Sequence, residues 1–141
     1  MQSISAEAEE RLMMMLDQDE GVVANLYKDQ KGNWTIGRGF NLSANPLPMP
    51  IINALTEWVL NSLERQLLAH QPLYNHLNDT RKTVVLNIGY NTGYDGLMAF
   101  HRMWEAIHIN DFATAGKEII DSELAENRKQ RLAYLMERGT L

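Results

Sequence analysis

Two acidic residues and a threonine near the start of the chain have the types and the spacing that acid–base chemistry uses. Glu20 precedes a glycine, Asp29 lies nine residues after Glu20, and Thr35 lies six residues after Asp29. Hydrolysis of a glycosidic bond needs a proton donor on the leaving oxygen and a second carboxylate across the bond. Glu20 could be the donor and Asp29 the second carboxylate, while the Thr35 hydroxyl could help Asp29 hold a water molecule.

The residues before Glu20 predict a helix that would favour the protonated form of its carboxyl. Ser5 is a suitable N-cap, the first 16 or so residues have helical character, and Gly21 is the residue type that usually follows a helix end. A carboxyl at the C-terminal end of a helix meets the negative end of the helix dipole. Asp19 next to it adds like-charge repulsion. Both effects disfavour the ionised form, as a proton donor requires.

The residues after Glu20 predict a small β-hairpin that would bring the other two candidates together. Residues 25–28 and 33–36 have strand character, and the turn between them begins at Asp29. Because a hairpin folds back on itself, Asp29 and Thr35 can lie near each other, and both can face Glu20 if the helix end abuts the sheet. A turn rich in backbone N–H donors would keep Asp29 ionised.

Each of the three residues also has an ordinary structural interpretation. Glu20 can be a solvated acid at a helix end, Asp29 a turn former that bonds its own backbone, and Thr35 a β-branched strand residue. The residues alone leave both interpretations open. In the same first helix, the run Met13–Met15 is predicted to fill the core, because Met adapts to irregular gaps.

The rest of the chain is predicted to be helical after a proline-rich loop at residues 43–50. Apolar residues recur at three- and four-residue steps over residues 52–67, Pro72 ends that stretch, and two glycines, Gly93 and Gly96, mark a turn. Further helices are predicted over residues 82–90, 98–107, 111–121 and 127–138. The predicted fold class is α+β, with a small N-terminal lobe that carries a short β-sheet or hairpin and a larger all-helical C-terminal lobe.

Composition narrows the function classes. A chain of 141 residues fits one domain, and 45% hydrophobic residues indicate a globular protein. The net charge of −5 argues against a nucleic-acid partner, since phosphate binding needs a basic face. The chain has no cysteine, and its histidines form no i, i+4 pair, so we assign no metal site and no cofactor. No apolar run is long enough for stable membrane insertion.

The stretch from Met15 to Gly39 resembles the phage-type lysozymes, the T-even phage endolysin-like muramidases of glycoside hydrolase family 24. The family pattern has Glu-Gly at the end of the first helix, an Asp nine residues later and a Thr six residues after that, within a Thr-Ile-Gly-x-Gly frame; residues 35–39 keep this frame. Fainter similarity continues to the end of the chain. The resemblance implies a single lysozyme-like domain over residues 1–141, with a β-containing lobe at about 15–55 and a helical lobe of 1–14 and 56–141.

The family is known for hydrolysing the β-1,4 bond between N-acetylmuramic acid and N-acetylglucosamine in peptidoglycan, with inversion at the anomeric carbon. The resemblance therefore implies a bacteriolytic glycosidase with Glu20 as the general acid and with Asp29 and Thr35 positioning the attacking water. It also implies that Asn41, Tyr90 and Arg128 bind substrate.

Two of these positions carry additional expectations. Arg128 matches a family arginine near the catalytic Glu, and we expect it to pair with Glu20, which would favour the ionised carboxylate and oppose the helix-end effect. Tyr90 matches an aromatic residue that lines the family's groove, although a core tyrosine with a satisfied hydroxyl is an equal alternative. Phe40 stands where the family often has a His, which removes an ion-pair option but not the proposed chemistry.

The expected biology follows from the family. The partner would be bacterial peptidoglycan, reached from the host cytoplasm with the help of a holin, and the place of action would be the cell wall in the periplasm. The first ten residues lack the basic and apolar regions of a signal peptide, and a monomer is the default for this class. The first alternative is a non-catalytic lysozyme-like domain that binds glycan or another protein. A bacteriocin or secreted effector, or a helical regulator with Arg81 and Lys82 on DNA, are less favoured.

Overall fold

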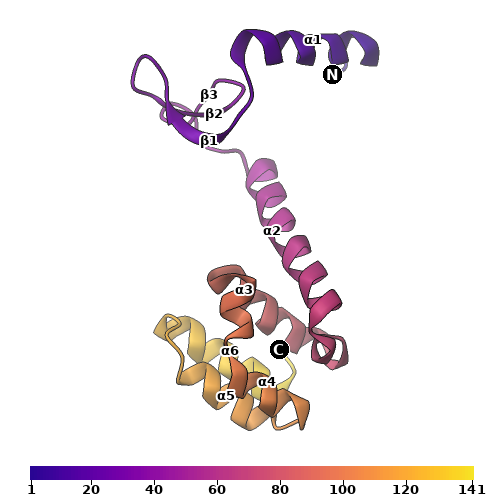
Figure 1. Ribbon diagram of the computed structural model, residues 1–141, viewed down its shortest axis with the longest axis vertical. Coiled ribbons are helices and arrows are strands. Elements are labelled where there is room, and N and C mark those ends of the chain that lie inside the picture. Colours follow the sequence, from indigo (N-terminus) through magenta and orange to yellow (C-terminus); the bar gives the residue numbers. More distant parts are fainter. The chain divides into compact units, whose positions relative to one another are not determined.

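A helix, a three-stranded sheet and a series of helices follow one another in the computed structural model, which describes residues 1–141 (Figure 1). The chain forms two units, Met1–Ile52 and Asn53–Leu141. Most of the chain is helical, and the one small antiparallel sheet lies near the N-terminus. This architecture confirms the predicted α+β class. The assignment of residues 1–14 to the helical lobe stays a prediction.

Helix α1 begins and ends where its capping residues predict. It spans Ala6–Glu20. The Ser5 hydroxyl oxygen accepts a hydrogen bond from the backbone N–H of Ala8 at 3.1 Å, which satisfies one of the free donors of the first turn. At the other end Gly21 has a φ of 73°, and its N–H donates to the Asp17 carbonyl. Glu20 is therefore the last residue of the helix.

Three strands follow α1 and form an antiparallel sheet in the order β1-β2-β3, with β1 at Val23–Lys28, β2 at Trp34–Gly37 and β3 at Phe40–Asn41. Strands β1 and β2 are the two strands of the predicted hairpin, with Tyr27 opposite Thr35. Strand β3 was not predicted. It is two residues long and exists through its pairing with β2, so no alternating pattern could reveal it.

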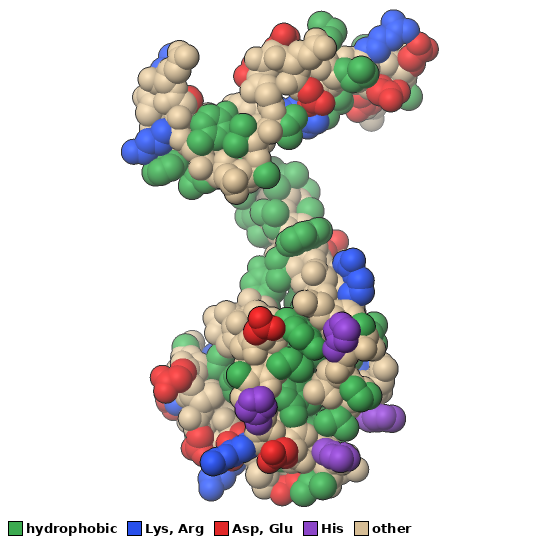
Figure 2. Space-filling model, in the orientation of Figure 1, with side chains coloured by type: hydrophobic (Ala, Val, Ile, Leu, Met, Phe, Trp, Pro, Cys, Tyr) green, Lys and Arg blue, Asp and Glu red, His purple; other side chains and the backbone are tan.

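The prediction that Met13–Met15 fill a core is wrong. Their side chains are 41%, 61% and 57% exposed, and α1 has no buried residue. Successive residues of a helix point about 100° apart, so three in a row spread over more than half of its circumference and cannot all face one partner. Figure 2 shows hydrophobic side chains at the surface of the first unit.

The second unit is a set of packed helices. Helix α2 begins at the end of the first unit and continues into the second. The core of the second unit is apolar and includes Leu67, Val85, Ile88 and Met136, all without exposed surface. The helices are α2 Met49–His70, the 3₁₀ helix η1 Pro72–His76, α3 Asp79–Met98, α4 His101–His108, α5 Phe112–Ile120 and α6 Glu126–Arg138.

The predicted turn at Gly93 is present as a kink, because Gly93 has a φ of 77° inside α3. The predicted loop at 43–50 ends slightly earlier than expected, since α2 starts at Met49. None of the helices has the combination of length and apolar character that crossing a bilayer requires.

Arg81 joins the start of α3 to the end of α6. Its Nε donates to the Met136 carbonyl at 2.7 Å and its Nη2 donates to the Glu137 carbonyl at 2.9 Å. The guanidinium lies 3.5 Å from the ring centre of Phe112. A side chain at Gly139 would clash with it, since a Cβ there would be 2.7 Å from Arg81 Cζ. Arg81 thus caps the carbonyl end of α6.

Candidate active site

The carboxyl of Glu20 lies directly against the backbone of Gly39. A Cβ built on Gly39 would be 2.8 Å from Glu20 Oε2, and Gly39 has a φ of 68°. Position 39 therefore requires glycine for two reasons. The backbone has a positive φ, and the Glu20 carboxyl occupies the space that a side chain would need. The last residue of α1 and the turn between β2 and β3 meet at this point, so the helix end does abut the sheet in the way that the sequence allowed.

Asp29 occupies the first position of the turn after β1, and its carboxylate is held by several donors. Oδ1 accepts from the backbone N–H groups of Asn33 at 2.8 Å and Lys31 at 2.9 Å. Oδ2 accepts only one longer bond of 3.3 Å, from the Asn33 side-chain amide. The backbone N–H of Asn33 is the largest of the effects that hold the pKa of the Asp29 carboxyl below its usual range. Asp29 is thus ionised, and Oδ2 is its less occupied oxygen.

Thr35 is the one buried polar residue of the chain, with 2% of its surface exposed. It lies on β2, and its hydroxyl donates to the carbonyl oxygen of Asn33 at 2.9 Å. A hydroxyl that donates its hydrogen in this way can still accept a bond on its oxygen. The structure does not join Thr35 to Asp29 by a direct hydrogen bond; instead Asn33 bonds to both.

Asn41 lies on β3 directly opposite Thr35. Its side-chain oxygen accepts from the backbone N–H of Ala44 at 3.1 Å, which leaves its amide N–H groups for other partners. Asn41 and Gly39 line a surface depression of about 430 Å³ together with Asp29, Gln30, Lys31 and Asn33. Two of the predicted residues, Asp29 and Asn41, therefore line one hollow in the first unit, and Glu20 contacts Gly39, a third residue of its lining.

Two residues that the sequence analysis did not single out also act on this region. Asn33 connects Asp29 to Thr35, and Arg38, between two glycines, forms an ion pair with Asp17 of α1. The aspartate at the start of the turn was a usable signal for the Asn33 contact, because Asp side chains in turns commonly accept hydrogen bonds from the backbone of the residues that follow. The Arg38 contact joins residues 21 positions apart, and no local pattern indicates it.

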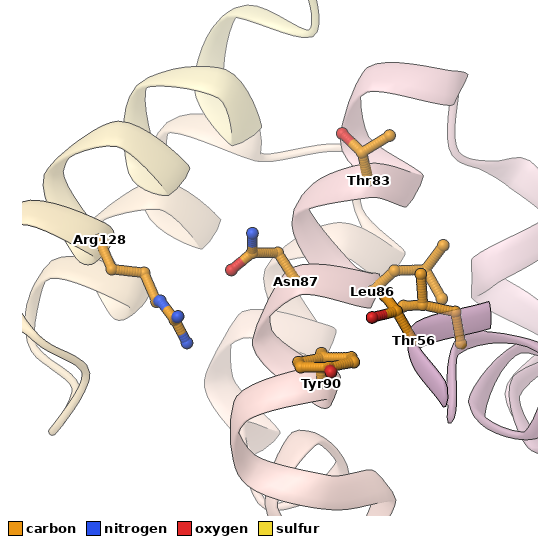
Figure 3. Close-up of a pocket in the computed structure, with 7 residues that line it drawn as sticks. Thr56, Thr83, Leu86, Asn87, Tyr90 and Arg128 are labelled. Atoms are coloured by element: carbon orange, nitrogen blue, oxygen red, sulfur yellow. The ribbon is translucent and has the colours of Figure 1, made fainter. Parts of the chain in front are cut away.

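Tyr90 and Arg128 belong to the helical unit. They line an open pocket of about 330 Å³ with Asn87 of α3 (Figure 3). Tyr90 is 47% exposed, so the alternative that it is a core residue is wrong. The side-chain oxygen of Asn87 is buried without a hydrogen-bond partner. The other residues of this pocket are Thr56, Leu60, Thr83 and Leu86. The predicted pairing of Arg128 with Glu20 stays a prediction.

No group of three or more His, Asp or Glu side chains is arranged to hold a metal ion. What the first unit offers instead is acid–base chemistry: an exposed carboxyl at a helix end, an ionised carboxylate in a turn, and a hydroxyl oxygen that can accept a hydrogen bond. The structural roles proposed as alternatives for Asp29 and Thr35 are also present, since Asp29 does bond its own turn and Thr35 does pack in a strand.

Comparison with known proteins gives two curated relatives from Dictyostelium discoideum. The chain is 26% identical to a protein named "Probable T4-type lysozyme 1" and 25% identical to one named "Probable T4-type lysozyme 2". Both alignments cover 90% of this chain and 94% of the relative. No protein-family model matches the chain.

Proposed function

We propose that this T4-lysozyme-like protein is a muramidase, which hydrolyses the β-1,4 bond between N-acetylmuramic acid and N-acetylglucosamine in bacterial peptidoglycan. The observation that carries the proposal is the arrangement in the first unit. Glu20 lies against Gly39, and Gly39 lines the same hollow as Asp29, whose carboxyl has a pKa lowered mainly by the backbone N–H of Asn33. A proton donor and a carboxylate are the two groups that glycoside hydrolysis needs.

In the proposed reaction Asp29 is the base and binds the attacking water through Oδ2. Oδ1 already accepts two backbone N–H groups, whereas Oδ2 has one long bond. The water donates one hydrogen to Oδ2 and the other to the Thr35 oxygen, whose own hydrogen is donated to Asn33. The hydrogen bond from Thr35 to Asn33 supports this role, because it leaves the Thr35 oxygen able to accept.

Glu20 is the general acid. As the bond breaks, its proton goes to the leaving glycosidic oxygen, while the water oxygen attacks the anomeric carbon from the opposite face and its proton goes to Asp29. One displacement inverts the anomeric configuration. Such a reaction needs the two carboxyl groups about 6.5–9.5 Å apart, so that the water fits between them.

Three further residues would bind the glycan. The free amide N–H groups of Asn41 can donate to a sugar hydroxyl, since its oxygen is already occupied. The exposed ring of Tyr90 offers an apolar face, and Arg128 offers guanidinium donors. By analogy with the family alone, we place the action of the protein at the bacterial cell wall after release from the cytoplasm with a holin as partner.

The decisive test compares the wild-type protein with Glu20→Gln on outer-membrane-permeabilised cells and on purified peptidoglycan. The substitution removes the transferable proton but keeps the size of the side chain, so the rate should fall by about 10²–10⁴-fold. Glu10→Gln is the matched control, because Glu10 is an exposed acid on the same helix and should leave the rate unchanged. New reducing ends give the rate.

The outcomes separate the proposal from its alternative. A wild-type protein that releases no reducing ends, or a Glu20→Gln variant as active as the wild type, would refute the catalytic role. Binding to peptidoglycan without turnover would identify the non-catalytic glycan-binding domain. The first product should be the α anomer in NMR spectra recorded during hydrolysis, and an initial β anomer would contradict inversion.

A further inference from the structure

An ion pair ties the last turn of α1 to the turn that follows β2. Asp17 lies three residues before Glu20, and its Oδ1 accepts a hydrogen bond from Nε of Arg38. Arg38 lies between Gly37 and Gly39, which both have a φ of 68°. The pair therefore joins the segment that ends in Glu20 to the segment against which the Glu20 carboxyl rests.

Glycines border this contact on both sides. Gly21, with a φ of 73°, follows Glu20 and leads into β1, while Gly37 and Gly39 flank Arg38. Glycine has the widest backbone freedom of any residue, so the chain direction at these three positions is not fixed by local geometry. A side-chain contact between the two segments restricts where the end of α1 lies relative to the sheet.

Folding stability does not explain this ion pair. The Asp17 and Arg38 side chains are 44% and 37% exposed, and ion pairs at such positions contribute little to stability because water and salt screen them. The position of the Glu20 carboxyl is more sensitive to such a contact than folding stability is. Acid catalysis depends on the donor lying within hydrogen-bond reach of the leaving oxygen, and a displacement of about 1 Å can cost about 100-fold in rate.

We propose that Asp17 and Arg38 are positioning residues for Glu20, and that their ion pair fixes the Glu20 carboxyl over Gly39 at the correct place relative to Asp29 and Thr35. Neither residue touches the reacting atoms. Asp17 acts through the backbone of α1, because Gly21 closes the last helical turn onto the Asp17 carbonyl. Arg38 acts through its neighbour Gly39. The inference rests on the proposed muramidase function.

The test uses three variants of the full chain: Asp17→Asn, Arg38→Gln, and the exchanged pair Asp17→Arg with Arg38→Asp. Each single variant breaks the charge pair, and the double variant restores it with the charges reversed. The matched control is Glu7→Gln, which breaks the ion pair of Glu7 with Arg11 on the same helix. We would measure kcat and KM with soluble peptidoglycan fragments, and Tm by circular dichroism.

We expect each single variant to lose about tenfold in kcat, with KM changed less than about twofold and Tm close to that of wild type. The exchanged pair should recover most of the lost kcat, and Glu7→Gln should match the wild type. Recovery in the double variant separates positioning from an unspecific loss of charge, because the two substitutions are then non-additive.

Two results would overturn the inference while leaving the muramidase function in place. Single variants with wild-type kcat would show that the pair positions nothing, and an exchanged pair no better than the singles would show that the two residues are not coupled through their charges. A wild-type protein without turnover would overturn the muramidase function itself, and this inference with it.

Discussion

The helical unit and the sheet-bearing unit are stabilised by different kinds of contact. Every buried hydrophobic residue of the chain lies at or after Leu63, in the helical unit. In the first unit Thr35 alone is buried, and large apolar side chains such as Leu26 and Trp34 are about half exposed. The first unit is instead ordered by helix caps, sheet hydrogen bonds and the Asp29 turn.

This difference separates stability from chemistry. The proposed catalytic residues lie in the unit with little apolar burial, and directional polar contacts fix their positions. Burial of apolar surface is the dominant favourable term in folding, whereas a net hydrogen bond contributes much less. Substitutions in the helical unit should therefore change stability most, and substitutions around Asp29 should change activity at nearly constant stability.

The largest effect on stability is expected from Leu67→Ala. Leu67 on α2 has no exposed surface, so its truncation leaves a cavity in the core and should cost about 2–5 kcal/mol of unfolding free energy. The neighbouring Leu68 is 51% exposed and Leu26 of β1 is 53% exposed. Truncating either one should change the unfolding free energy by less than about 0.5 kcal/mol. Denaturant unfolding of the three variants measures this. A loss of unfolding free energy at Leu26 equal to that at Leu67 would contradict the view that apolar burial stabilises mainly the helical unit.

Asp29→Asn should lower activity and leave stability nearly unchanged. The amide oxygen of Asn can still accept the backbone N–H groups of Lys31 and Asn33, so the turn and the melting temperature should be kept. The base that takes the proton of water is lost, and the rate of peptidoglycan hydrolysis should fall by about 10²-fold or more. A variant that hydrolyses at the wild-type rate would rule out Asp29 as the base.

Gly139→Ala should destabilise the helical unit by more than the backbone alone explains. Gly139 has a φ of 70°, and its Cβ would meet the Arg81 guanidinium at 2.7 Å. A left-handed backbone costs a non-glycine residue about 1–2 kcal/mol, and displacement of Arg81 adds to this. Gly32→Ala is the control, because Gly32 has a φ of 81° but open space around it. Equal losses at both positions would mean that Arg81 contributes nothing.

The smallest effect is a shift of the pH profile in Asn33→Ala. The Asn33 side-chain amide is one of the groups that lower the pKa of Asp29, although its backbone N–H has the larger effect and remains in the variant. The pKa of Asp29 should rise toward its usual range, so activity should begin to fall at a higher pH on the acid side. Rates measured across the acid range test this, and an unchanged or lower midpoint would contradict it.

The lowered pKa of Asp29 also determines how folding stability changes with pH. Because the pKa of Asp29 is lower in the folded protein than in the unfolded chain, its contribution is fully present above the usual pKa of an aspartate. It is lost as the pH falls through the folded value. The stability difference between wild type and Asn33→Ala should therefore shrink on acidification, as unfolding midpoints at neutral and acidic pH would reveal.

Much of the local structure was predictable. The Ser5 cap, the helix end before Gly21, the hairpin around Asp29 and the turn at Gly93 all follow from residue types with strong local preferences. The third strand and the exposure of Met13–Met15 were not predictable, because each depends on contacts with other segments. For Tyr90 the sequence left a groove residue and a core residue open, and its exposure excludes the core residue.

The sequence by itself determined the order of the elements, their ends and the spacing of Glu20, Asp29 and Thr35 along the chain. Caps and turns depend on neighbours only a few residues away, so the amino-acid types suffice for them. Only the tertiary structure decided that Glu20 rests on Gly39 and that Arg38 reaches Asp17. Contacts between the helix and the sheet depend on how the chain folds back through its glycine turns, and the residue types at either end leave that direction open.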